Sequence, residues 1–165
     1  MKWKLLFCLF LILIPLGCWY DSPFSEVQEI PLDKEVFGWW EIVSDNEAEA
    51  KERMLVLPFS KAEYLIHYLT GEKETFYFRG YPVKIGDVAF VQLQVIGTME
   101  GLPEKDSAPF YAVSYQLSDD GLTVRTLNLD LVEEEVKGSE ALRKAFLEHK
   151  DDPDLFRDPG RFKRP

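Results

Sequence analysis

The sequence predicts a mainly β domain, an antiparallel meander sheet or barrel of about seven to eight strands with a short C-terminal helix. Short apolar runs alternate with turn signals along most of the chain, as is typical of antiparallel all-β domains. In the longest run, 88–96, small or apolar residues alternate with others so that one face is apolar and the other carries glutamines. Aromatic residues make up 14% of the chain, which supplies bulky side chains for a core.

The expected strands follow one another between recognisable turns. They cover residues 36–43, 53–59, 63–69, 75–80, 88–96, 110–117 and 122–132. Glycine and aspartate mark the bends between them at 70–73, 86–87 and 118–121. The segment 118–121, Ser-Asp-Asp-Gly, is the strongest hairpin signal in the chain.

The C-terminal part changes in pattern from strand to helix. Ser139 is a plausible N-cap with Glu140 in the first turn, and apolar residues recur at helical spacing up to about residue 150. Asp152 and Pro153 then end the helix. The rest of the chain, to residue 165, is interpreted as a basic tail with a few apolar docking points.

The first residues have the composition of a secretory signal. A short basic start precedes the apolar run Leu5–Leu16, and Gly17 follows. The run is too short to span a membrane, because spanning takes about 20 apolar residues. We therefore expect residues 1–17 to be a signal peptide, 18–34 a tether, and 35–165 a single β-rich domain.

The end of this leader resembles the lipobox of bacterial lipoproteins. The resemblance covers Pro15-Leu16-Gly17-Cys18, with Pro15 where the family prefers Leu, Val or Ile. It implies cleavage after Gly17 and a diacylglyceryl group on Cys18, which would hold the exported protein on a bacterial envelope membrane. Two or more acyl chains bind a membrane stably. The alternative is ordinary secretion with Cys18 unmodified.

A second resemblance concerns the start of the β domain. Gly38-Trp39-Trp40 is similar to the Gly-x-Trp motif on the first strand of lipocalin-like (calycin) barrels. The resemblance implies that Trp40 plugs one end of a barrel beneath an arginine from a late strand. Arg125 is the candidate for that arginine, stacked on Trp40 as a cation–π pair.

The charge and the cysteine content argue against nucleic-acid partners and against disulfide bonds. The formal net charge is −10, which disfavours nucleic acids and anionic headgroups as partners. The two cysteines are Cys8, inside the leader, and Cys18, so the domain is expected to contain no disulfide.

Two functional classes remain open, a non-enzymatic binding or structural module and an enzyme. For binding, five aromatic residues could line a pocket for a small apolar ligand or else simply fill the core: Tyr64, Tyr68, Phe90, Tyr111 and Tyr115. An envelope protein is the other possible partner. An enzyme would assemble its site from scattered residues such as Tyr64, His67 and Arg79. The sequence contains no nucleophile, phosphate-loop or metal-ligand motif, so we expect no catalytic residue, cofactor or metal.

Overall fold

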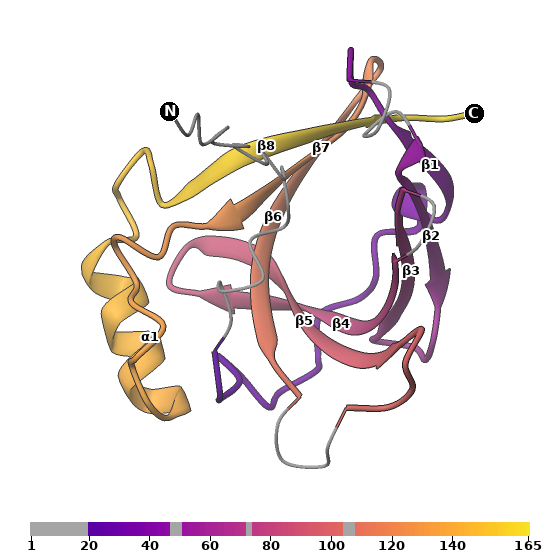
Figure 1. The fold of residues 1–165 in the computed structure, drawn as a ribbon. Coiled ribbons are helices and arrows are strands. Elements are labelled where there is room, and N and C mark those ends of the chain that lie inside the picture. The colour runs from indigo at the N-terminus through magenta and orange to yellow at the C-terminus, as the bar shows by residue number, and fades with distance from the viewer. Residues whose placement is uncertain (1–19, 47–50, 72–73, 104–107) are drawn as a thin grey trace, which may run out of the picture.

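Eight antiparallel strands form a single sheet that closes on itself (Figure 1). The computed structural model describes residues 20–46, 51–71, 74–103 and 108–165. Each strand pairs with the next along the chain, and the first pairs with the last. The prediction of a mainly β domain with seven to eight antiparallel strands and a short C-terminal helix is therefore confirmed.

The strands differ in length, and the central ones are the longest. They are β1 (Gly38–Ile42), β2 (Arg53–Pro58), β3 (Tyr64–Thr70), β4 (Glu74–Ile85), β5 (Val88–Thr98), β6 (Phe110–Ser118), β7 (Gly121–Leu127) and β8 (Phe156–Lys163). A single-turn 3-10 helix, η1 (Lys34–Val36), precedes β1, and the helix α1 (Ser139–Glu148) lies between β7 and β8.

Strand alternation separates the buried apolar side chains into two clusters. The first lies inside the ring and includes Trp40, Tyr64 and Phe78. The second lies outside it, where Leu142 and Phe146 of α1 pack against the end of the β4–β5 hairpin. Figure 1 shows α1 beside this hairpin, on the opposite side of the molecule from β1 and β2.

The segment before β1 belongs to this outer cluster. Tyr20 and Phe24 are 1% and 0% exposed. The Phe24 ring lies 5.5 Å from Phe90 and 6.0 Å from Phe146, centroid to centroid. Tyr20 also forms an isolated β-bridge to Phe110, outside the named strands. The prediction that residues 18–34 are a tether is therefore wrong for residues 20–25, because two buried aromatic rings and the bonds from Gln92 fix this part to the domain.

The predicted signal peptide, 1–17, and Cys18 lie outside the described residues. In the part of the chain that is described, no helix is long and apolar enough to cross a membrane.

The predicted C-terminal tail is instead the strand that closes the ring. β8 pairs with β7 along most of its length and with β1 through Phe162 and Lys163. Periodicity did not reveal it, because Asp158-Pro159-Gly160 interrupts the alternation. The register with β7 shifts at this point, between Val124 and Thr126, as in a β-bulge.

The helix and the strongest hairpin occur near their predicted positions. α1 ends at Glu148, and its N-cap is Gly138 rather than the predicted Ser139. The hairpin between β6 and β7 turns at 118–121, where Gly121 has a φ of +132°. A β-carbon at Gly121 would lie 2.1 Å from the carbonyl oxygen of Phe162, so this position requires glycine.

Candidate functional site

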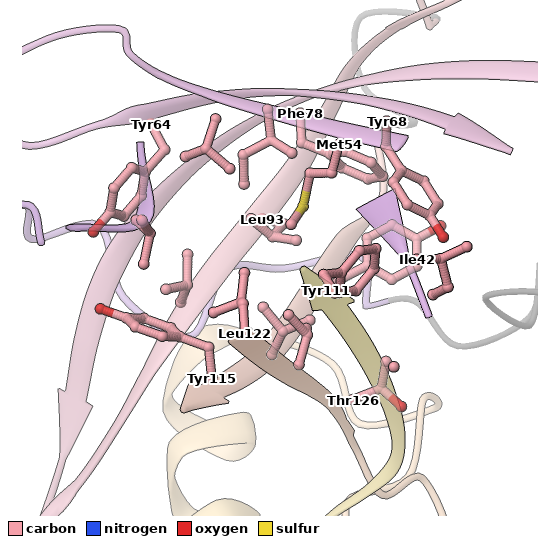
Figure 2. A pocket seen from close by; sticks show the side chains of 18 of the residues that line it. Ile42, Met54, Tyr64, Tyr68, Phe78, Leu93, Tyr111, Tyr115, Leu122 and Thr126 are labelled. Atoms are coloured by element: carbon pink, nitrogen blue, oxygen red, sulfur yellow. The ribbon is translucent and has the colours of Figure 1, made fainter. Parts of the chain in front are cut away.

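An apolar cavity of about 500 Å³ lies inside the ring of strands (Figure 2). Its wall draws on all eight strands and on η1. The lining residues are Val36, Ile42, Glu52, Met54, Val56, Tyr64, Ile66, Tyr68, Phe78, Val91, Leu93, Tyr111, Val113, Tyr115, Leu122, Val124, Thr126, Asp158, Pro159, Gly160 and Phe162. Most of these side chains are aliphatic or aromatic, so the cavity suits hydrocarbon rather than polar groups.

The period of the strands determines which side chains reach the cavity. On β5, Val91 and Leu93 line it. On β6, the lining residues are Tyr111, Val113 and Tyr115. Residues of opposite parity, such as Ser114, lie on the outer face. The alternation in the sequence therefore indicates which residues of β5 and β6 line the cavity.

Four of the five predicted pocket residues line the cavity: Tyr64, Tyr68, Tyr111 and Tyr115. The fifth, Phe90, does not. It directly precedes Val91 on β5, so it points to the other face and packs on Phe146 of α1, with the ring centroids 5.0 Å apart. The prediction for Phe90 is wrong because aromatic character alone does not indicate the face of a strand.

One end of the cavity is sealed by two tyrosines and an aspartate. Tyr64 is 2% exposed, and its hydroxyl accepts a hydrogen bond of 2.8 Å from the backbone N–H of Asp33. The Tyr115 hydroxyl donates to Asp33 Oδ2 at 3.1 Å. Asp33 Oδ1 accepts from the backbone N–H of Glu35, which caps η1 across this end. Burial raises the pKa of both tyrosines, so their hydroxyls are neutral at physiological pH.

Trp40 lies beside this seal and is 1% exposed. Its indole N–H donates to the carbonyl oxygen of Val36 at 2.8 Å, which ties β1 to η1. The guanidinium carbon of Arg164 lies 3.8 Å from the ring centroid, a cation–π geometry. The same guanidinium donates to the carbonyl oxygens of Phe37 and Glu35, each at 2.6 Å.

The cation over Trp40 is therefore Arg164 rather than the predicted Arg125. Arg125 lies between Val124 and Thr126, both of which line the cavity, so its own side chain belongs to the outer face of β7. The prediction extended the parity of Leu127 back along the strand. Arg125 and Leu127 do share a face of β7, but it is the outer one, where Leu127 belongs to the cluster that packs beside α1.

The opposite end of the cavity carries acidic residues and reaches solvent. Figure 2 shows Ile42, Tyr68 and Thr126 at the end away from Tyr64 and Tyr115. The Tyr68 hydroxyl donates to the carboxylate of Glu52. Asp158, in the bulge of β8, has a φ of +55° and a side chain that is 70% exposed. We call this end, defined by Ile42, Glu52, Tyr68, Thr126 and Asp158, the mouth.

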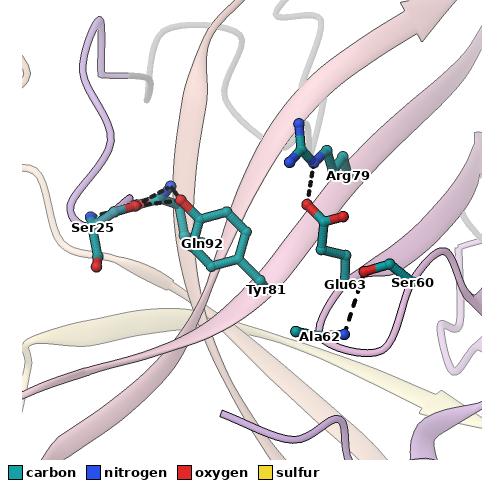
Figure 3. A network of polar contacts seen from close by, with 7 residues as sticks. All are labelled: Ser25, Ser60, Ala62, Glu63, Arg79, Tyr81 and Gln92. Carbon is teal, nitrogen blue, oxygen red and sulfur yellow. Dashed lines mark hydrogen bonds and ion pairs between the residues drawn. The ribbon is translucent and has the colours of Figure 1, made fainter. Parts of the chain in front are cut away.

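The residues proposed for an enzyme do not converge. Tyr64 points into the cavity, whereas His67 stacks on Tyr77 on the outer face, with centroids 4.7 Å apart and planes at 4°. Arg79 forms an ion pair with Glu63 (Figure 3). Among the described residues, no group of three or more His, Cys, Asp or Glu side chains is placed to hold a metal ion.

Gln92 lies on the face of β5 opposite to the cavity, as the alternation predicted, but it is buried. It is 1% exposed, and Figure 3 shows it between Ser25 and Tyr81. Its Oε1 accepts from the N–H of Phe24 at 2.6 Å and its Nε2 donates to the Tyr81 hydroxyl at 2.7 Å. These bonds hold the N-terminal segment against the outside of the ring. No local pattern predicts them, because the partners are distant in sequence.

The outer wall of the ring also carries a row made of two aromatic residues, a leucine and a histidine. Trp39 pairs with Leu55, Leu55 with His67, and His67 with Tyr77, so the four side chains adjoin across β1 to β4. Trp39 is 45% exposed and Tyr77 is 38% exposed. We call these four residues the outer row.

Comparison with protein-family models, with curated proteins and with solved structures found no match to the chain. The function therefore has to be argued from the geometry of the residues themselves.

Proposed function

We propose that the protein is a lipid-anchored bacterial envelope protein whose lipocalin-like barrel binds a small apolar ligand without catalysing a reaction. The cavity is the observation that carries the proposal. Its volume, about 500 Å³, lies within the range of roughly 300–1,000 Å³ common for small-molecule sites. An empty space of this size with apolar walls costs stability unless something fills it. A protein that binds an apolar ligand in this cavity recovers that cost when the ligand fills it.

A substitution that fills the cavity tests the binding function. Val113→Trp places a large ring in the space, whereas Ser114→Trp adds the same ring on the outer face of the same strand. We expect wild type and Ser114→Trp to bind decanol and Val113→Trp to lose that binding. Equilibrium dialysis measures the affinity, and circular dichroism verifies that both variants fold.

Equal decanol binding by the two tryptophan variants would contradict the proposal, since the ligand would then lie outside the barrel. Native mass spectrometry of the purified protein adds a direct search for a retained ligand.

The anchor rests on the sequence of the leader, Gly17-Cys18 after a basic and apolar start. We expect Cys18→Ala to abolish incorporation of labelled palmitate and to prevent maturation. Mass spectrometry of the mature N-terminus measures the modification directly. Fatty acid that remains on the Cys18→Ala protein would refute the assignment.

The outer row favours a second candidate function, binding of another envelope protein. Exposed apolar side chains that adjoin over several strands often mark a contact surface. A photo-crosslinking amino acid at Trp39 should then capture a defined partner in whole cells, while the same group at Ser114, on β6 and outside the outer row, should not. Identical products from both positions would argue against a specific surface.

A further inference from the structure

We propose that the cavity selects amphiphiles with a cationic or neutral head group and discriminates against fatty acids and other carboxylates. This inference rests on the proposed ligand-binding function and names the chemical class of the ligand. It follows from the different chemistry of the two ends of the cavity.

The sealed end accepts only hydrocarbon. Its hydroxyl groups, on Tyr64 and Tyr115, are already bonded to Asp33. A polar head group placed there would find these partners occupied and would lose its own hydration. The apolar tail of a ligand therefore points to this end, and its head group lies at the mouth.

The mouth offers hydrogen-bond acceptors of negative charge. Among the described residues that line the cavity, the charged ones are Glu52 and Asp158, both acidic. Thr126 adds a hydroxyl group. An ammonium head would donate to such groups, and charge-assisted hydrogen bonds are stronger than neutral ones. A carboxylate head would meet like charge and would find no cation among the described residues of the wall.

Two cations that directly precede the acidic residues of the mouth in the chain, Lys51 and Arg157, do not reverse this sign. Arg157 is shared between two carboxylates, with Nε 3.4 Å from Asp158 Oδ2 and Nη1 2.6 Å from Asp130 Oδ2. One guanidinium thus balances two negative charges. Lys51 is exposed and directly precedes Glu52 in the chain, but it is not part of the cavity wall.

Three ligands with ten carbon atoms each vary the head group at nearly constant chain length. Decylamine is cationic, decanol neutral and decanoate anionic at pH 7. The full chain is held in lipid nanodiscs, binding is measured by equilibrium dialysis, and the uptake by empty nanodiscs is subtracted. We expect decylamine to bind about tenfold more tightly than decanoate, because partly exposed charge pairs interact weakly. The difference should shrink in high salt.

Neutralising both acidic residues of the mouth tests whether they cause the preference for a cationic head group. Glu52→Gln combined with Asp158→Asn keeps the shapes, and asparagine tolerates the positive φ at position 158. We expect the preference for decylamine over decanoate to fall to less than about threefold. The matched control, Glu134→Gln with Glu140→Gln, changes the net charge equally at exposed positions outside the cavity wall and should preserve the preference.

Decanoate binding as tight as that of decylamine would overturn this inference. The proposed function would still stand in that case if decanol binds and Val113→Trp abolishes its binding. Loss of binding for all three ligands would instead overturn the proposed function. A preference that both double variants lose equally would show that net charge, rather than the mouth, selects the ligand, and would also overturn the inference.

Discussion

At the scale of single residues, the sealed end of the cavity depends on two neutral tyrosines. Tyr64 and Tyr115 are bonded to Asp33, and burial disfavours their ionised forms. Their positions followed from strand alternation in the sequence. Their partner Asp33, in the segment before β1, did not, because the contact joins residues that are far apart in the chain.

These tyrosines predict a loss of stability in alkaline solution. Their pKa is raised on folding, so the unfolded chain loses the phenolic protons first as the pH rises. Their contribution to the free energy of unfolding is complete below about pH 10 and decreases above it. Urea unfolding between pH 8 and 11 measures this fall.

The variant Tyr64→Phe with Tyr115→Phe should show a shallower fall above pH 10, whereas Tyr77→Phe, at a partly exposed position, should follow wild type. A slope unchanged in the double variant would assign the alkaline loss to other groups.

At the scale of elements, most strands follow from the sequence, and those that do not have a physical reason. Alternation and turn residues predict β1 to β7 within a few residues, although β4 extends to Ile85 and β7 already ends at Leu127. β8 was missed because a bulge at Asp158-Pro159 hides its period. The choice of Arg125 was wrong for another reason: Arg125 and Leu127 share a face of β7, but alternation alone does not indicate that this face is the outer one.

Alanine should destabilise the protein more at Gly121, in the β6–β7 hairpin, than at Gly101, although both glycines have positive φ. At Gly101, φ is +123° and a β-carbon would meet nothing within 4 Å, so Gly101→Ala should cost about 1–2 kcal/mol from backbone strain alone. At Gly121 a β-carbon would collide with the backbone of Phe162. Gly121→Ala should therefore cost about 2 kcal/mol more.

Chemical denaturation of the two glycine variants measures both free energies of unfolding. Equal losses would mean that β8 can move away from the turn at no cost.

At the scale of the whole molecule, the N-terminal segment and α1 complete the fold outside the ring. Phe24 packs on rings from β5 and α1, and Gln92 bonds its backbone N–H. The sequence predicted the sheet, the helix and much of the cavity wall, since these follow local periods. It gave no sign that residues 20–25 pack on the domain, because proline, serine and acidic residues there are typical of a linker.

The packing of this segment can be tested with one substitution. Phe24→Ala should lower the free energy of unfolding by about 3–5 kcal/mol, as expected for a fully buried ring. Phe59→Ala removes the same group at a position that is 55% exposed and should cost less than about 1 kcal/mol. Thermal and urea unfolding measure both values. If both substitutions lower the free energy of unfolding by a similar small amount, residues 20–25 do not pack stably on the domain.

The pairing of β1 with β8 determines when the cavity can form. Ile42 and Phe162, near opposite ends of the chain, are partners in this pairing. The ring therefore stays open until β8 is in place, and β1 meanwhile presents an unpaired edge. Pairing over such a long sequence separation is slow. The cavity, and with it the proposed binding site, is consequently incomplete until β8 pairs with β1 and β7, so ligand capture can begin only after this pairing.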